Sequence, residues 1–274
     1  MQQTDRRAEL LTQLSEGIAS LTTSDQWRRH LDYQSRFHRY SVGNVVLIAA
    51  QCPHARQVAG FRAWAKLGRT VRRGEKAIWI LAPMVRRTSR SEDPGDDPVV
   101  RGFRCVPVFD LSQTEGAELP EICHRLSGDD PTALFAGLTA VATALGYSVV
   151  RTALPDGRNG DCSYSLRRIR VEEGNAAAQQ VKTLAHEIAH AFLHHDGADR
   201  RLAELEAEST AFVVCRSLGL DTGLYSFGYV ATWAGGGEAA VAGIRASCGR
   251  IQHAAGVILD QMGSGQPVAH SPAA

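Results

Sequence analysis

The chain has 274 residues and a formal net charge of +1, enough for one large domain or two of ordinary size. Residues 1–126 carry 19 Lys or Arg against 14 Asp or Glu, whereas residues 127–274 carry 11 against 15. The imbalance is sharpest in residues 25–90, with 14 basic and 3 acidic residues, which favours a polyanion as partner. The absence of an 18-residue apolar run and of a signal-like N-terminus argues against a membrane partner. Six scattered cysteines without a C-x-x-C pair favour free thiols, so we expect a cytoplasmic protein.

The first half reads as helices joined to an antiparallel sheet. Helices are expected at residues 5–21, 24–40, 44–51 and 61–67. Strands are expected at residues 77–81 and 99–111, on either side of a polar loop at residues 88–98.

Arginine and aromatic residues are interleaved through residues 25–90. A groove for single-stranded nucleic acid uses this combination, because cations follow the phosphates and flat rings stack on bases of any sequence. However, Arg-rich faces are often only solvated, and Trp and Phe are often core residues. Composition alone leaves both interpretations open.

Residues 25–120 also carry a series of landmarks: Tyr40-Ser41, Asn44, Gln51, Pro53, Gly60-Phe61, Trp64, Gly68-Arg69, Val71, Gly74-Glu75-Lys76 and Gln113-Thr114. With these landmarks the segment resembles the N-terminal single-stranded-DNA-binding domain of ArdC-type antirestriction proteins. The resemblance implies sequence-nonspecific binding of single-stranded DNA and the protection of incoming mobile elements from restriction. The candidate DNA-contacting residues are Arg36, Arg39, Tyr40, Asn44, Trp64, Arg69, Arg72, Arg73 and Lys76.

The second half is expected to be a separate domain. We place the domains at residues 1–126 and 132–262, with a linker at 127–131 and a disordered tail at 263–274. In the second domain, helices are expected at residues 132–145, 181–195, 201–218, 219–233 and 237–262. Strands are expected at residues 147–154 and 163–174, on either side of a turn at 155–161. The segment 163–171 is the candidate for pairing with an extended peptide.

The helix at residues 181–195 contains the pattern H-E-x-x-H as His186, Glu187 and His190. Residues four apart lie on one face of a helix, so the two imidazoles converge on one point and can bind Zn²⁺. A catalytic zinc keeps one position for water, and Glu187 is placed to accept a proton from that water. The pattern therefore predicts a metal-dependent hydrolase.

The third ligand is expected on the following helix. In metzincins a Gly and then a third His follow the motif, but these positions hold Leu193 and Asp196 here. The usual turn is therefore missing, and Asp196 is a weak candidate. His194 is one turn too far along a straight helix to share the ion. Glu204 and Glu208 share one face of the next helix, although a solvated acidic face is the alternative. The order resembles that of gluzincins, which implies Glu204 as ligand and Glu208 as support for a ligand histidine, with Glu206 pointing elsewhere.

This half, with HEIAH followed by ELEAESTAF, is also similar to the ImmA/IrrE endopeptidases, which act on repressor proteins; it has Glu208 where they commonly have Asn. ArdC-type proteins likewise join their DNA-binding domain to an H-E-x-x-H half. We therefore expect an α+β protein with a single-stranded-DNA-binding domain and a gluzincin-like zinc peptidase domain. Two alternatives remain: a regulatory endopeptidase that cleaves a repressor, and a DNA-binding protein whose zinc site is structural. Tyr225, Tyr229 and His253 are further candidates for stabilising an oxyanion, although structural roles suit them better.

Overall fold

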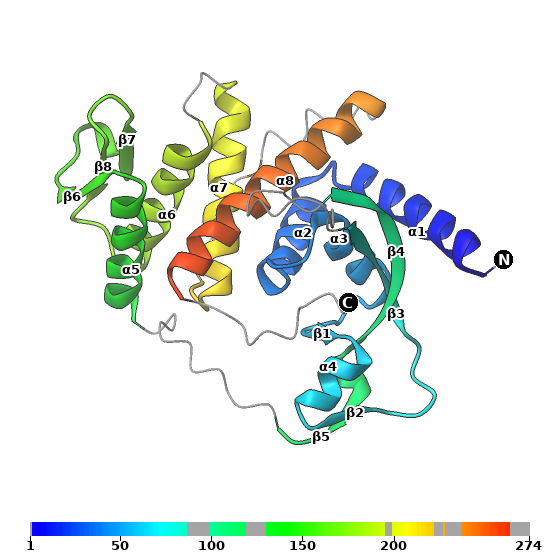
Figure 1. Cartoon of the computed structure of the whole chain (residues 1–274). Helices are drawn as coiled ribbons and strands as arrows, with labels where there is room; N and C mark the ends of the chain where they lie inside the picture. The colour runs from blue at the N-terminus through cyan, green and yellow to red at the C-terminus, as the bar shows by residue number, and fades with distance from the viewer. Residues whose placement is uncertain are drawn as a thin grey trace, which may run out of the picture. The chain divides into compact units, whose positions relative to one another are not determined.

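We describe the protein from a computed structural model, in which residues 2–86, 99–118, 130–194, 199–221, 227 and 237–263 are described. These residues form helices and three small sheets (Figure 1). They divide into two compact units, the first formed by residues up to 17 and 43–118, the second by residues 18–42 and 130–263. The expected α+β class and two-domain organisation are confirmed.

The first unit combines three helices with antiparallel strands. Its helices are α1 (Gln2–Ala19), α3 (Val42–Gln51), α4 (Phe61–Lys66) and the 3₁₀ turn η1 (Leu111–Gln113). Its strands are β1 (Val58–Ala59), β2 (Arg69–Val71), β3 (Ile78–Arg86), β4 (Val99–Asp110) and β5 (Thr114–Gly116). One sheet has the order β1-β4-β3, and β2 pairs with β5. The core joins α1, α3 and the long hairpin of β3 and β4 through Leu10, Leu47 and Cys105.

Several landmark residues of this unit hold its backbone together. The amide of Asn44 donates to the carbonyl of Leu81 (3.0 Å) and accepts from its N–H (2.9 Å), and Gln51 makes the same pair of bonds with Trp79. Asp110 is 1% exposed and accepts hydrogen bonds from the N–H groups of the 56–57 loop and of η1. Burial disfavours its charge, but these hydrogen bonds outweigh burial and lower the pKa of Asp110.

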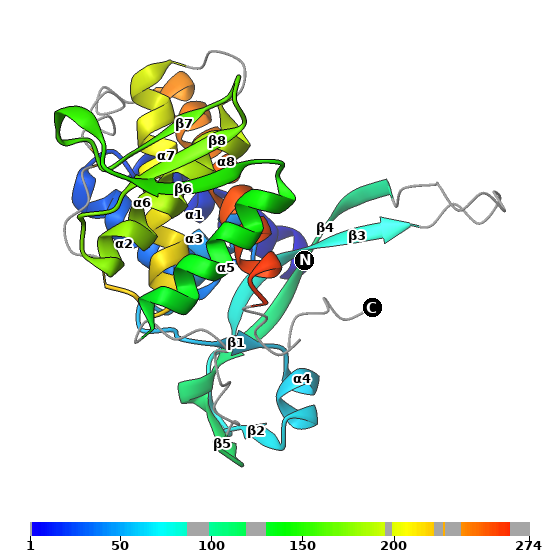
Figure 2. The ribbon, with the colours of Figure 1, turned by 90° about the vertical axis from the view of Figure 1, so that its left-hand side faces the viewer.

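The second unit packs helices around a mixed sheet. Its helices are α2 (Ser24–Arg36), α5 (Pro131–Ala144), α6 (Ala177–Leu193), α7 (Arg200–Ser217), α8 (Glu238–Gln261) and the 3₁₀ turn η2 (Pro155–Gly157). Its strands are β6 (Ser148–Thr152), β7 (Gly160–Ser163) and β8 (Arg168–Glu172). The central strand β8 is parallel to β6 and antiparallel to β7. The sheet lies beside α5 and α6 (Figure 2), and α6 also packs against α7 and α8.

The single strand expected at residues 163–174 is wrong. Ser163 ends β7, and the chain then turns so that the N–H of Arg167 donates to the carbonyl of Tyr164. Arg167 has a φ of 46°, the left-handed conformation that such a reversal requires. Because β8 is paired on both sides, it cannot accept a peptide, and the edge strands of this sheet are β6 and β7.

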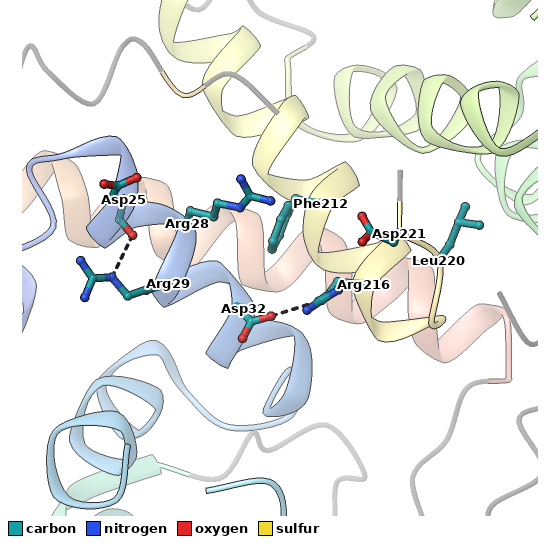
Figure 3. A pocket seen from close by; sticks show the side chains of 8 residues that line it. All are labelled: Asp25, Arg28, Arg29, Asp32, Phe212, Arg216, Leu220 and Asp221. Carbon is teal, nitrogen blue, oxygen red and sulfur yellow. Dashed lines mark hydrogen bonds and ion pairs between the residues drawn. The ribbon is translucent and has the colours of Figure 1, made fainter. Parts of the chain in front are cut away.

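Helix α2 packs on α7 within the second unit, although its sequence was expected in the first domain. The indole N–H of Trp27, which is fully buried, donates to the hydroxyl of Ser209 (2.9 Å). On the exposed side, the guanidinium of Arg216 donates to Asp32 (3.0 Å), and both side chains line a cavity of about 460 Å³ (Figure 3). The compact C-terminal unit thus includes a helix that precedes the first unit's sheet in sequence.

Several expectations fall on residues outside the described ranges. These are the loop at 88–98, all but the end of the linker at 127–131, most of the helix at 219–233, the tail beyond 263, Asp196, Tyr225 and Tyr229. Among the helices that are described, none is both long and apolar enough to cross a membrane.

Candidate metal centre

Three potential ligands converge where α6 meets α7. The Nε2 atoms of His186 and His190 are 3.0 Å apart, and an oxygen of Glu204 lies 3.4 Å and 3.7 Å from them. Zinc bonds to nitrogen and oxygen of about 2.0–2.2 Å in a tetrahedron require ligand atoms roughly 3.3 Å apart. The donor set and its spacing therefore fit a zinc ion bound by two imidazoles and one carboxylate.

The local sequence explains this convergence. Helix α6 buries an apolar face that includes Leu184 and Ile188, which fixes the direction of the two histidines. Helix α7 begins after Asp199, whose carboxylate accepts the N–H groups of Arg201 and Leu202. Glu204 lies one turn further, with a side chain that is 54% exposed. An exposed carboxylate can adjust to a metal at little cost, whereas the histidines are held by the helix.

The protonation of these groups reflects their proximity. Burial opposes charge on His186, but hydrogen bonds with Glu204 and Glu208 raise its pKa to about 9. Hydrogen bonds from His186 and His190 lower the pKa of Glu204 strongly. Burial lowers the pKa of His190. Because metal ligands must be deprotonated, a metal ion bound here would compete with protonation of His186.

Glu208 contacts His186 at the ring nitrogen that does not face the other candidate ligands. Its carboxylate lies 3.1 Å from Nδ1 of His186, leaving Nε2 directed at the other candidate ligands. The ammonium group of Lys182 lies 3.0 Å from the same carboxylate and balances its charge. No metal-site pattern in the sequence includes Lys182, which is one turn before His186 on α6.

Glu187 lines the same cavity as the two candidate ligand histidines and lies close to Gly160 of strand β7. Its side chain is 8% exposed, and burial raises its pKa to about 7. Gly160 of β7 allows this approach, because a methyl group there would lie 2.5 Å from Thr183 and 3.1 Å from a carboxylate oxygen of Glu187. The carboxylate thus sits in a narrow space that only a glycine leaves open.

A cavity of about 620 Å³ opens over these groups. Strand β7 forms one wall with Gly160, Asp161 and Cys162, and α6 forms the floor. The hydroxyl of Tyr164, on the turn after β7, donates to the carbonyl oxygen of His190 (3.4 Å). No pattern in the sequence marks Tyr164, because its position depends on the turn between β7 and β8. His253 is exposed, and its ring centroid lies 5.5 Å from that of Phe192, with the two rings tilted relative to each other.

Of the nine candidate DNA-contacting residues, three form an exposed basic turn in the first unit. Arg72, Arg73 and Lys76 are exposed at the turn between β2 and β3. Arg72 pairs with Glu75 (2.8 Å), and Gln113 donates to the backbone carbonyl of Lys76, so the turn is held in place. Beside it lies a cavity of about 550 Å³.

Three other candidates in this unit have structural roles instead. Trp64 is fully buried and donates to the carbonyl of Phe109 (2.9 Å), so its ring is not available for stacking. Asn44 is 8% exposed, and its side-chain amide forms two hydrogen bonds with the backbone of Leu81. The guanidinium of Arg69 binds the hydroxyl of Thr114 (2.8 Å) and backbone carbonyls of β5. The predicted contacts of Trp64 and Asn44 with DNA do not fit this structure.

The remaining candidates belong to the second unit. Arg36 pairs with Asp32, and Arg39 lies 3.1 Å from Asp260. The carbonyl of Tyr40 accepts a hydrogen bond from Gln252, and burial raises the pKa of the Tyr40 hydroxyl. These three residues are therefore not part of the basic turn.

Comparison with known proteins relates each half of the sequence to a known family. Residues 4–110 match the family model of the N-terminal domain of anti-restriction factor ArdC. Residues 142–215 match that of the IrrE N-terminal-like domain, Peptidase_M78, and they include all three candidate ligands. The chain thus joins an ArdC N-terminal domain to an IrrE-like domain, and the resemblance seen in the sequence is confirmed.

Among individual proteins, the chain is similar to the antirestriction protein ArdC of plasmid R388. The metal-free crystal structure matches with a TM-score of 0.50 and 24% identity, over 83% of this chain and 86% of that one. The Mn(II)-bound structure matches with a TM-score of 0.48 and 25% identity, over 83% and 90%. An uncharacterized protein of Bacillus anthracis is 25% identical over 255 residues, and the match covers 76% of this chain but only 43% of that protein.

Proposed function

We propose that the second unit is a zinc-dependent peptidase. The convergence of His186, His190 and Glu204 next to the buried carboxylate of Glu187 carries this proposal. When bound, zinc would make a water molecule more acidic and polarise the substrate carbonyl. Glu187 would accept the proton of that water and pass it to the leaving amine.

The edge strand β7 is the proposed docking site for substrate. Its backbone lines the cavity, and no other described strand occupies its outer edge. An extended peptide that pairs with β7 would lie across the candidate metal site, held by backbone hydrogen bonds that tolerate varied sequences. This geometry suits a protein or peptide substrate.

Metal dependence of cleavage tests the peptidase proposal. We expect the purified full-length protein to cleave members of a peptide library, as detected by mass spectrometry. Cleavage should stop after treatment with a chelator and return when Zn²⁺ is added, because the water and carbonyl are activated only with metal present. Cleavage that survives complete removal of metal would refute the proposal.

We propose a second function for the first unit, the binding of single-stranded DNA. The exposed turn with Arg72, Arg73 and Lys76 supports it, since three cations on one braced turn can follow a phosphate backbone. The imidazole of His54, exposed on the neighbouring cavity wall, offers a flat surface for a base. Together with the antirestriction role in the name of the R388 protein, this favours protection of incoming DNA.

A further inference from the structure

A chain of buried polar groups runs away from the candidate metal site behind His190. Nδ1 of His190 lies 3.2 Å from Nδ1 of His194, and Nε2 of His194 lies 3.3 Å from a carboxylate oxygen of Glu206. Ser247 donates to Glu206 (2.7 Å), and the guanidinium of Arg250 donates to it as well (2.9 Å). His194 is 8% exposed, Glu206 1% and Ser247 0%.

The positions of the protons follow from the partners. Glu206, which already accepts from Ser247 and Arg250, is an acceptor, so Nε2 of His194 carries the N–H directed at it. In the tautomer with its proton at Nε2, Nδ1 of His194 is an acceptor. A hydrogen bond between Nδ1 of His190 and Nδ1 of His194 contains one proton, and with His194 as acceptor that proton belongs to Nδ1 of His190. The lone pair of His190 Nε2 is left free, and this atom is the one that faces His186 Nε2.

The two candidate ligand histidines are therefore supported in parallel. Glu208 holds His186 directly and is balanced by Lys182, whereas Glu206 acts through His194 and is balanced by Arg250. The three glutamates at alternate positions of α7 thus have distinct roles: Glu204 as a candidate ligand, and Glu206 and Glu208 as supports. Arg250 and Ser247 also connect α8 to this arrangement.

We propose that His194 and Glu206 are positioning residues that fix the tautomer and orientation of His190 for metal binding. The inference rests on the metal site proposed above. Groups that orient a ligand from behind commonly change metal affinity by about 10- to 100-fold. His194 spans the distance between His190 and the carboxylate of Glu206.

Zinc affinity of the full-length protein, measured by competition with a chelator, tests the proposal. We expect His194→Phe, which keeps a ring but removes the acceptor, to bind zinc about 10- to 100-fold more weakly than wild type. His194→Asn places an amide oxygen where Nδ1 lies, so it should recover part of that loss. His253→Phe, at the exposed histidine of α8, is the matched control and should bind as wild type does.

Nitrogen-15 NMR of the metal-free wild type provides a readout that a purely structural role would not produce. We expect the His190 proton at Nδ1 and the His194 proton at Nε2. A proton at Nε2 of His190, or zinc affinity of folded His194→Phe and His194→Asn within threefold of wild type, would overturn the positioning role. A wild type that binds no zinc would instead refute the metal site itself.

Discussion

Replacing Glu187 with Gln is expected to reduce peptide cleavage by about 10²- to 10⁴-fold while leaving zinc bound. Gln has the same shape but cannot accept the proton of the attacking water. The carboxylate is not one of the three converging ligands, so metal content should stay the same. The side chain is buried, and a neutral amide is tolerated there at least as well as a charge. Cleavage rates and elemental analysis of the same sample give both quantities.

The control for this substitution is Glu173→Gln, which changes an exposed carboxylate outside the site in the same way. It should cleave as fast as wild type. If Glu187→Gln also does so, the proposed role of Glu187 is refuted. A restriction-protection assay separates the alternatives: equal protection by wild type and Glu187→Gln favours a DNA-binding protein with a structural zinc site. A repressor that accumulates in cells with the variant favours a regulatory endopeptidase.

Neutralising the basic turn is expected to weaken single-stranded DNA binding. The triple substitution Arg72→Gln, Arg73→Gln and Lys76→Gln removes three cations. For single strands, each cation that neutralises a phosphate contributes about 0.7 to the slope of log affinity against log salt concentration. The salt slope should therefore fall by about 2, and affinity at low salt should fall on the order of 10- to 100-fold. Fluorescence titrations with a labelled oligonucleotide at several salt concentrations measure both effects.

A triple variant with the same change in charge provides the control. Arg200, Arg201 and Arg245 are exposed in the second unit, and their replacement by Gln should leave the salt slope unchanged. Equal losses in the two triple variants would mean that net charge alone determines binding. An unchanged slope in the first variant would remove the turn from the DNA interface.

The candidate metal site could be predicted because helix geometry fixes most of it. His186 and His190 are four residues apart on a buried helix, so their convergence needs no knowledge of the tertiary fold. Glu204 required an assumption about how the following helix packs, which resemblance supplied. The pairing of Glu206 with His194 and Arg250 could not be predicted, because it depends on how α7 and α8 pack together.

The DNA candidates show where sequence reasoning fails. A buried tryptophan such as Trp64 and an exposed one look alike in a sequence, and only the packing of the folded chain distinguishes them. Asn44 resembles a polar contact residue, yet it joins α3 to β3. Helix α2 has an arginine-rich surface, but Trp27 and Asp32 of this helix form hydrogen bonds with side chains of α7. A division of the chain by composition places this helix with its sequence neighbours rather than with its packing partners.

Metal content is the most direct test of the central claim that His186, His190 and Glu204 form a zinc centre. Elemental analysis should find about one zinc per chain in the purified wild type and none in a variant with both His186→Ala and His190→Ala. The same samples, titrated with labelled single-stranded DNA, should bind it equally well. A correctly folded wild type that takes up no metal, or a double variant that retains it, would contradict the claim.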